Sequence, residues 1–360
     1  MLFSALRTSS FRNLLDNELN IKSKDVFLVG ENGQGKTNFL EAIYFCSYAS
    51  SFRGVSDNEL VKTSEKACSA QAEFSDSLYN KVLVKYENSK KTVYLDGKCL
   101  DDRGELLSVV PCIVFCHEDM EFVAGTPERR RWFFDQNQSL YDPVYLDDLR
   151  KYRHILKTRN ALLRKAKITG NSLNSMLSAI DPQIALYGLA LMEKRLSSAE
   201  HFSNVFTPLY EEVSGIDKIG IKYASSWKEM NIEGIIADLE KYRERDLIAG
   251  LTLTGPHRDR YIFNRERLEF TGKASTGQRR LLALLLRVAQ AKHFSEITRK
   301  NPVLLLDDVL LELDPEKKRK FISVMPEYDQ AFYTFLPEEP FERYCKSDTL
   351  VYNVVNGMIS

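Results

Sequence analysis

The sequence lacks three features of secreted and membrane-embedded proteins. Its six cysteines stand far apart along 360 residues, so we expect no disulfide framework. Its apolar runs are interrupted well before the roughly 18 residues that a membrane span needs. No long apolar segment follows the first residues, as a secretory signal would require. We therefore expect a protein of the reducing cytoplasm that has no membrane partner.

An excess of charge of one sign is also absent. The 50 Lys and Arg residues balance 50 Asp and Glu residues, so nucleic-acid binding would have to use a local basic patch. We expect no zinc site. Cys112, Cys116 and His117 have no fourth ligand at a suitable spacing, and buried thiols are the better interpretation. The apolar fraction of 44% is ordinary for a globular protein and supplies a sizeable core.

The order of secondary-structure signals predicts an α/β protein of two or three lobes. Short β-like stretches with turn signals fill residues 1–110, including a hairpin layer predicted over residues 81–97. Residues 111–245 are mostly helical in pattern, and β-like runs return within residues 246–360. We expect one α/β lobe made from both ends of the chain, with residues 111–245 as a mostly helical inserted domain.

A phosphate-binding loop is the strongest local signal. The apolar stretch 25–29 leads into a match to G-x-x-x-x-G-K-[ST], and apolar residues then recur at helical spacing. In this context backbone N–H groups surround a triphosphate, the lysine bridges the β- and γ-phosphates, and the threonine hydroxyl coordinates Mg²⁺. We therefore predict ATP and Mg²⁺ as ligands. The motif consists of Gly30, Glu31, Asn32, Gly33, Gln34, Gly35, Lys36 and Thr37.

Two acidic residues follow a second apolar strand, predicted over residues 303–306. Such a strand can bring Asp307 beside the phosphate loop, where its carboxylate holds the magnesium shell through water. Asp308 then faces the γ-phosphate and orients the attacking water, so we predict that it acts in catalysis together with Lys36. A turn at an exposed strand end is the alternative interpretation of this pair taken alone.

The subclass of ATPase is indicated by Ser275, Gly277 and Gln278, which form a Ser-x-Gly-Gln turn ahead of a leucine-rich helix. This turn precedes the acidic strand, as it does in ABC-type ATPases. There, the serine and the N–H groups at the helix start meet a γ-phosphate that the opposite subunit binds. We therefore expect the ATP site to be completed by a second copy of the chain.

With these motifs in place, the chain resembles the RecF family, bacterial recombination-mediator ATPases related to SMC proteins. The resemblance runs almost end to end, and the Gly-Pro-His-Arg-Asp segment with the paired aspartates separates this family from other ABC-type ATPases. It implies an ABC/SMC-head P-loop ATPase lobe with a β-hairpin layer and a mostly helical insertion. The matching segments are 11–13, 30–38, 40–42, 51–53, 118–119, 125–127, 129–131, 152–160, 255–259, 274–278, 307–309 and 312–314.

The resemblance also implies a function. RecF-like proteins dimerise with ATP on duplex DNA or duplex/single-strand junctions, and slow, DNA-stimulated hydrolysis releases the DNA. They act with RecO and RecR partners to place RecA on gapped DNA in repair, replication and the SOS response. The resemblance adds Arg12 and Asn38 as nucleotide contacts and Asp314 as part of a loop that crosses the dimer. Thr334 stands where the family has a run of threonines, and the residue for the Q-loop task within 115–119 stays open.

A basic segment is the candidate DNA contact. Residues 129–167 contain eleven Lys and Arg residues against four acids, a local charge of +7. We expect Arg150, Lys151 and Arg153 to contact DNA phosphates without reading bases, because no major-groove reader motif appears. The alternative is a solvated helix face whose arginines pair with acids elsewhere.

Two other functions compete with a DNA-gated ATPase. The nucleotide-binding subunit of a membrane transporter would lack the long helical insertion and the 255–259 segment. A scaffold that binds ATP without turnover would share all the motifs, and a turnover assay separates it. His257 suits a catalytic base, but a brace for its own turn is the favoured interpretation.

Overall fold

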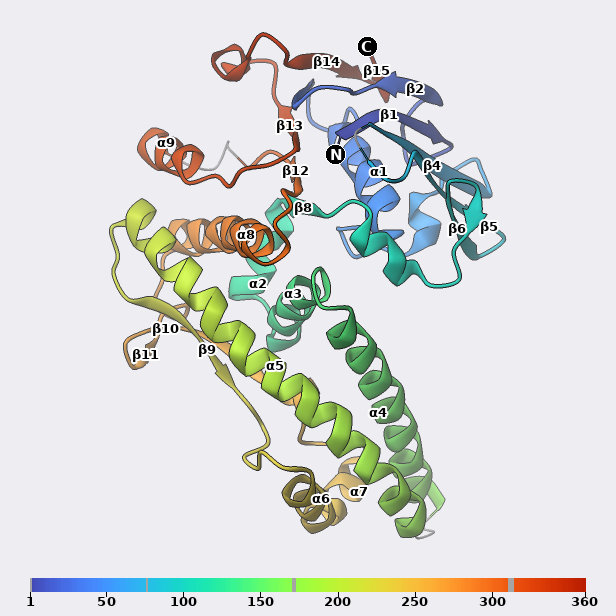
Figure 1. The fold of residues 1–360 in the computed structure, drawn as a ribbon, viewed down its shortest axis with the longest axis vertical. Helices are drawn as coiled ribbons and strands as arrows, with labels where there is room; N and C mark the ends of the chain where they lie inside the picture. The colour runs from blue at the N-terminus through green and yellow to red at the C-terminus, as the bar shows by residue number, and fades with distance from the viewer. Residues whose placement is uncertain (1, 76, 170–172, 310–313) are drawn as a thin grey trace. The chain divides into compact units, whose positions relative to one another are not determined.

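Contacts divide the chain into two compact units in the computed structural model (Figure 1). The N/C unit comprises residues 1–119 and 286–360, and the middle unit comprises residues 120–285. The division at 1–110, 111–245 and 246–360 stays a prediction. Residues 312–313 of the family resemblance lie outside the described residues, which are 2–75, 77–169, 173–309 and 314–360.

A six-stranded sheet in the order β15-β14-β3-β13-β12-β8 is the centre of the N/C unit. All its strands run parallel except β15, which pairs antiparallel with the end of β14. Strands β3, β8 and β12 are buried along their whole length, as expected of parallel strands that are covered on both faces. The strands are β3 (Asp25–Val29), β8 (Cys112–Phe115), β12 (Val303–Leu306), β13 (Gln330–Phe335), β14 (Leu350–Val355) and β15 (Met358–Ile359).

An antiparallel sheet in the order β2-β1-β4-β5-β6-β7 forms the second layer of this unit. Burial alternates along β4, so one face of this sheet packs on the core. Helix α1 (Lys36–Tyr48) contacts β4 and β5 of this sheet and β13 of the parallel sheet. These layers confirm the predicted α/β lobe with a β-hairpin layer. The strands are β1 (Leu2–Ser9), β2 (Asn17–Asn20), β4 (Ala67–Ser75), β5 (Lys81–Glu87), β6 (Lys90–Leu95) and β7 (Lys98–Cys99).

Helix α8 (Thr276–Thr298) begins in the middle unit and ends in the N/C unit. In its second part, Arg287 donates from Nε and Nη2 to Asp119 Oδ1, at 3.0 and 2.7 Å. Both side chains are buried, so this ion pair fixes α8 to the segment that follows β8. The other short elements of the N/C unit are η1 (Asp57–Leu60), η2 (Arg103–Ser108), α9 (Pro315–Ser323) and η5 (Phe341–Tyr344), and η3 (His117–Met120) ends at the unit boundary.

The middle unit is mostly helical, as predicted. Helices α4 (Pro143–Thr169) and α5 (Asn174–Ser214) pack along each other, and α5 also covers β9 of the sheet β11-β10-β9 (Figure 1). Helix α3 (Pro127–Ser139) starts with proline at its first position, and the Thr126 hydroxyl accepts from Arg129 N. The remaining elements are α2 (Glu121–Ala124), β9 (Ile219–Ala224), α6 (Ile232–Lys241), α7 (Arg243–Ala249), η4 (Pro256–Arg258), β10 (Arg260–Arg265) and β11 (Leu268–Glu269).

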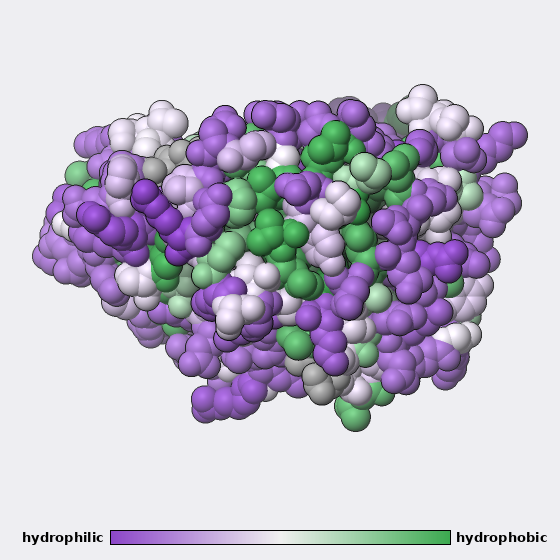
Figure 2. Space-filling view, turned by 90° about the horizontal axis from the view of Figure 1, so that it is seen from above, coloured by the Kyte–Doolittle hydropathy of each residue, from purple (hydrophilic) through white to green (hydrophobic). Residues whose placement is uncertain are grey.

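Both apolar and polar side chains reach the surface, as the mixed composition leads us to expect. Hydrophobic side chains gather near the middle of the face seen in Figure 2, and hydrophilic side chains flank them. Among the helices of the described residues, α4 and α5 are long, yet none of these helices is apolar enough over a sufficient length to cross a membrane.

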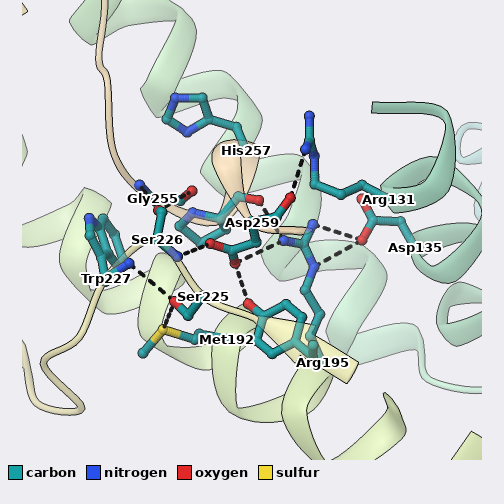
Figure 3. Close-up of polar contacts among 12 residues, drawn as sticks. Arg131, Asp135, Met192, Arg195, Ser225, Ser226, Trp227, Gly255, His257 and Asp259 are labelled. Carbon is teal, nitrogen blue, oxygen red and sulfur yellow. Dashed lines mark hydrogen bonds and ion pairs between the residues drawn. The ribbon is translucent and has the colours of Figure 1, made fainter. Parts of the chain in front are cut away.

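A buried polar network braces the middle unit around the Gly-Pro-His-Arg-Asp segment (Figure 3). Arg195 donates to Asp135 Oδ1 at 2.8 Å from Nη2 and to the Pro256 carbonyl at 2.6 Å from Nη1. Asp259, fully buried, accepts from Ser226 N at 2.7 Å and from the Tyr223 hydroxyl. The network connects α3, α5, β9 and the 255–259 turn, and the buried Asp259 carboxylate is an acceptor from that turn.

His257 serves as a brace in this turn. Its Nε2 lies 2.9 Å from the Thr252 carbonyl, so Nε2 carries the proton of the neutral ring, and Nδ1 accepts from the Tyr152 hydroxyl at 2.8 Å. Burial lowers the pKa of His257 to about 4. A ring whose two nitrogens are both engaged inside the fold suits the structural interpretation.

Candidate nucleotide-binding site

The phosphate loop leaves β3 and enters α1 through three glycines that its backbone requires. A Cβ at Gly30 would lie 2.4 Å from the Val354 carbonyl oxygen, and Gly33 and Gly35 have φ of 80° and 118°. Gly35 caps α1 and, having no side chain, makes no capping hydrogen bond. The first N–H groups of α1 therefore remain available to an anion, as at other helix N-termini that bind phosphate.

The side chain of Lys36 folds back over the phosphate loop. Lys36 is 3% exposed, and its Nζ donates to the carbonyls of Gly30 at 2.6 Å and Glu31 at 3.3 Å. The ammonium group is thereby held at the centre of the loop, where a bound phosphate would face it. Glu31 and Asn32 themselves are exposed, whereas the Gln34 carbonyl and side chain accept from the backbone of Gly357 and Asn356, which ties the loop to the end of β14.

The two predicted aspartates meet the loop at the carboxyl edge of the parallel sheet. Strand register pairs Leu306 with Tyr333, so the residues that follow them emerge at the same edge. The Thr37 hydroxyl donates to Asp307 Oδ1 at 2.9 Å. Thr334 Oγ1 accepts from Asp308 N at 2.8 Å and lies 2.9 Å from Asp308 Oδ1. The hydroxyl of Thr334 therefore holds the Asp308 carboxylate in place.

The pair Thr37 and Asp307 fits a divalent cation. Burial raises the pKa of Asp307 to about 6, and the hydrogen bond from Thr37 opposes this rise. A buried carboxylate beside a hydroxyl offers hard oxygen ligands, and Mg²⁺ commonly takes one or two carboxylates with water and phosphate oxygens completing its shell. Within the described residues no cluster of three or more His, Cys, Asp or Glu forms an all-protein metal cage.

An open depression lies beside the phosphate loop. Its lining includes Arg12, Asn13, Asn38 and Arg53. Arg12 donates to the buried carboxylate of Glu41 from Nε at 2.8 Å and Nη2 at 3.0 Å. Asn13 Oδ1 accepts from Asn38 at 2.7 Å. The motifs pointed to Arg12 and Asn38, but they gave no role to Asn13, which also donates to the Gly33 carbonyl at 3.3 Å.

The Ser-x-Gly-Gln turn lies in the middle unit as an exposed helix start. Gln278 Oε1 accepts from Ser275 N at 2.8 Å and Ser275 Oγ accepts from Gln278 N at 3.2 Å, a reciprocal capping box at the start of α8. A Cβ at Gly277 would meet nothing within 4 Å. The turn therefore presents an open, polar surface formed by a serine, a glycine and helix N–H groups.

Asp314, like Ser275, lies at the start of a helix, in this case α9 of the N/C unit. It caps α9: Oδ1 accepts from Lys317 N at 2.9 Å, and Oδ2 accepts from Lys317 Nζ at 2.7 Å. These bonds hold the pKa of Asp314 below its usual value. The exposed carboxylate thus sets where α9 begins.

The candidate DNA contacts lie on exposed positions of α4. Lys151 pairs with Asp147 at 2.6 Å, and Arg153 pairs with Asp135 at 3.2 Å. Arg159, by contrast, is fully buried and pairs with Asp181 and Asp246, so it is unavailable to DNA. The acids that pair with Lys151 and Arg153 are already counted in the local charge of +7, whereas those that pair with Arg159 lie outside residues 129–167 and offset part of that charge.

Comparisons with known proteins agree with these features. The family described as RecF/RecN/SMC N terminal domain matches residues 2–359. The chain is 41% identical to the DNA replication and repair protein RecF of Treponema pallidum, over 97% of this chain and 98% of that one. It is 31% identical to the RecF of Clostridium acetobutylicum, over 100% and 99% of the two chains.

Solved structures give the same result. The structure of the recombination mediator protein RecF-ATP in the RecFOR pathway matches with a TM-score of 0.89 and 30% identity, covering 99% of this chain and 96% of that one. The SmcHead bound to the C-winged helix domain of ScpA matches with a TM-score of 0.54 and 13% identity, which shows a shared fold alone. Family match, sequence identity and fold all agree, and the chain belongs to the RecF family of DNA replication and repair proteins.

Proposed function

We propose that this chain is a DNA-binding ATPase of recombinational repair and replication maintenance. It binds ATP with Mg²⁺, dimerises on duplex or gapped DNA while ATP is bound, and releases the DNA after slow hydrolysis. The observation that carries the proposal is the convergence of Lys36, Thr37, Asp307 and Asp308 at one edge of the parallel sheet. A relative solved with ATP supports the nucleotide.

Each residue of the site has a role in this mechanism. Lys36 and the N–H groups of α1 bind the phosphates, and Thr37 with Asp307 would hold Mg²⁺, which would supply positive charge to offset that of the phosphates. Asp308 orients the water that attacks the γ-phosphorus as the bond to the β–γ bridging oxygen breaks. Turnover is slow because aspartate is one methylene shorter than the glutamate of many ABC-type enzymes.

In the proposed dimer, the signature turn of one copy completes the nucleotide site of the other. Ser275, Gly277 and Gln278 of one copy cover the γ-phosphate bound by its partner, and Asp314 lies in the loop that crosses the seam. The exposure of Ser275 and the open space around Gly277 at a helix start support this role. Arg12 and Asn38 contact the nucleotide beside the loop.

The partners follow from the family. A relative acts as a recombination mediator in the RecFOR pathway, so we propose RecO- and RecR-type partners and the loading of RecA on gapped DNA, including during the SOS response. All six cysteines are free, which fits the cytoplasm. A transporter subunit is a weaker alternative because it lacks the long α4–α5 insertion, and an ATP-binding scaffold without turnover remains the second alternative.

Sedimentation of the full chain tests this function. We expect a monomer without ATP, a dimer with ATP, and co-sedimentation of that dimer with gapped DNA. The Asp308→Asn chain should form a longer-lived ATP dimer, because it keeps the shape of the side chain but lacks the carboxylate that orients water. A monomer under all these conditions, or turnover unchanged in Asp308→Asn, would contradict the proposal.

The α4 cations give a separate prediction. Changing Arg150, Lys151 and Arg153 to Gln should weaken binding to all DNA sequences alike and reduce the salt slope of log K by about 2.7, since each phosphate contact contributes about 0.9. Gln avoids placing a new acid against Asp135. The matched control changes Lys157, Arg164 and Lys165, exposed cations of the same helix for which no ion pair is recorded among the described residues. Equal slopes for the native chain and the first variant would place the DNA elsewhere.

A further inference from the structure

A cavity of about 360 Å³ in the N/C unit takes no part in the proposed function. Leu306, Tyr333 and Phe335 line it. In the chain these residues adjoin Asp307 and Thr334, so the cavity lies on the same two strand ends as the nucleotide site. An occupant of the cavity would therefore contact the strands that carry the catalytic edge.

The walls of the cavity are aromatic and apolar. The Phe335 ring lies 6.1 Å from that of Tyr333 and 6.2 Å from that of Tyr344, with interplanar angles of 16° and 9°. Met325 adds a flexible, polarisable side chain that adapts to different occupants. Such walls favour an aromatic ring, because offset and edge-to-face contacts add to the gain from burial.

The mouth of the cavity is cationic. The one lining acid, Asp25, is 3% exposed and already bonded by the Tyr328 hydroxyl at 2.7 Å and Lys346 Nζ at 2.8 Å. Arg343 is exposed, and no ion pair is recorded for it within the described part of the chain. Lys318 Nζ lies 5.6 Å from the centroid of the Tyr344 ring. Lys346 and Asp25 offset each other, and Lys318 Nζ lies 4.0 Å from Glu339 Oε1, so Arg343 is the lining cation that attracts a carboxylate.

We propose that this cavity receives an aromatic side chain from an acidic segment of a partner protein. The ring fills the apolar interior, and a neighbouring carboxylate pairs with Arg343. The volume is near the lower limit for small-ligand pockets, which suits a single side chain as an anchor. Ile322, 39% exposed, continues the apolar surface at the mouth and gives the rest of the segment a place to lie. The proposal does not depend on the proposed function.

The rate of alkylation of Cys345 reports whether the cavity is occupied. Cys345 lines the cavity and is exposed, Cys99 is the other exposed cysteine, and the remaining four are buried. In the full chain with Cys99→Ser, iodoacetamide labelling is followed while three peptides are titrated: acetyl-Asp-Phe-Asp-amide, acetyl-Asp-Ala-Asp-amide and acetyl-Lys-Phe-Lys-amide. The acidic aromatic peptide should protect Cys345 at concentrations at least about tenfold lower than the alanine peptide, the scale expected for burying one ring. It should also protect at lower concentrations than the basic peptide, whose charge Arg343 repels.

A charge reversal gives the decisive comparison. Arg343→Glu should shift the preference toward the basic peptide, whereas Arg319→Glu, the same change at an exposed position of α9 outside the lining, should leave the preference unaltered. Protection is expressed relative to each variant without peptide. Equal protection by the three peptides, equal behaviour of the two variants, or protection by free phenylacetate at concentrations as low as those of the acidic peptide would each overturn the proposal.

Discussion

A chain that carries Ser275→Arg is expected to bind ATP normally and yet to remain monomeric at ATP concentrations at which we propose that the native chain dimerises. Lys36 and Thr37 are untouched, so the affinity of the monomer for ATP is preserved. The signature turn is exposed, and an arginine side chain there occupies the space that the γ-phosphate and the partner's loop would enter. Sedimentation with and without ATP, beside a calorimetric ATP titration, measures both effects.

The control for this variant comes from the capping box. Ser275 Oγ caps α8, so its loss costs about 0.5–2 kcal/mol of stability apart from any effect at the seam. Gln278→Ala removes the other half of the box and adds no bulk. If Gln278→Ala also loses the ATP dimer while unfolding at the same temperature as Ser275→Arg, the loss of dimer reflects the helix start and not steric blocking.

Lys36→Ala is expected to lower the affinity for ATP by about ten- to a hundredfold. The variant removes a charge-assisted hydrogen bond to phosphate, worth roughly 1.5–3 kcal/mol. It also removes the bonds from Nζ to the Gly30 and Glu31 carbonyls, so the loop loses part of its own support. Calorimetric titration measures the affinity, and Lys22→Ala, the same change at an exposed lysine between β2 and β3, is the matched control. An unchanged dissociation constant for Lys36→Ala would show that Lys36 does not bind the nucleotide.

Local motifs predicted the parts of the site that depend on local chain geometry. The loop at 30–37 needs glycines at fixed spacings, and Gly33 and Gly35 indeed adopt positive φ. The link between Thr37 and Asp307 was also expected, because one buried strand leads to each. Thr334 was named without a firm role, since its two contacts with the aspartates arise from strand register and not from sequence spacing.

Long-range pairing limited the rest of the prediction. The basic segment gave a charge count but not the partners of its arginines: Arg153 pairs with Asp135, which lies in the same segment but on α3, and Arg159 pairs with Asp181 of α5, outside the segment. A sequence pattern cannot separate a buried arginine from an exposed one in the same helix when the acid that buries it lies on another element. The aromatic cavity was missed for the same reason, because its walls come from three strands, α9 and η5.

The central claim is that two copies of the chain share each ATP site, and mixing two inactive variants tests it most directly. In a mixed dimer of Ser275→Arg and Lys36→Ala chains, one site combines both changes, and the other combines an unaltered loop with an unaltered signature turn. We predict that mixing restores ATP-dependent dimers and hydrolysis that neither variant shows alone. No recovery on mixing, or full activity of Ser275→Arg by itself, would contradict the account.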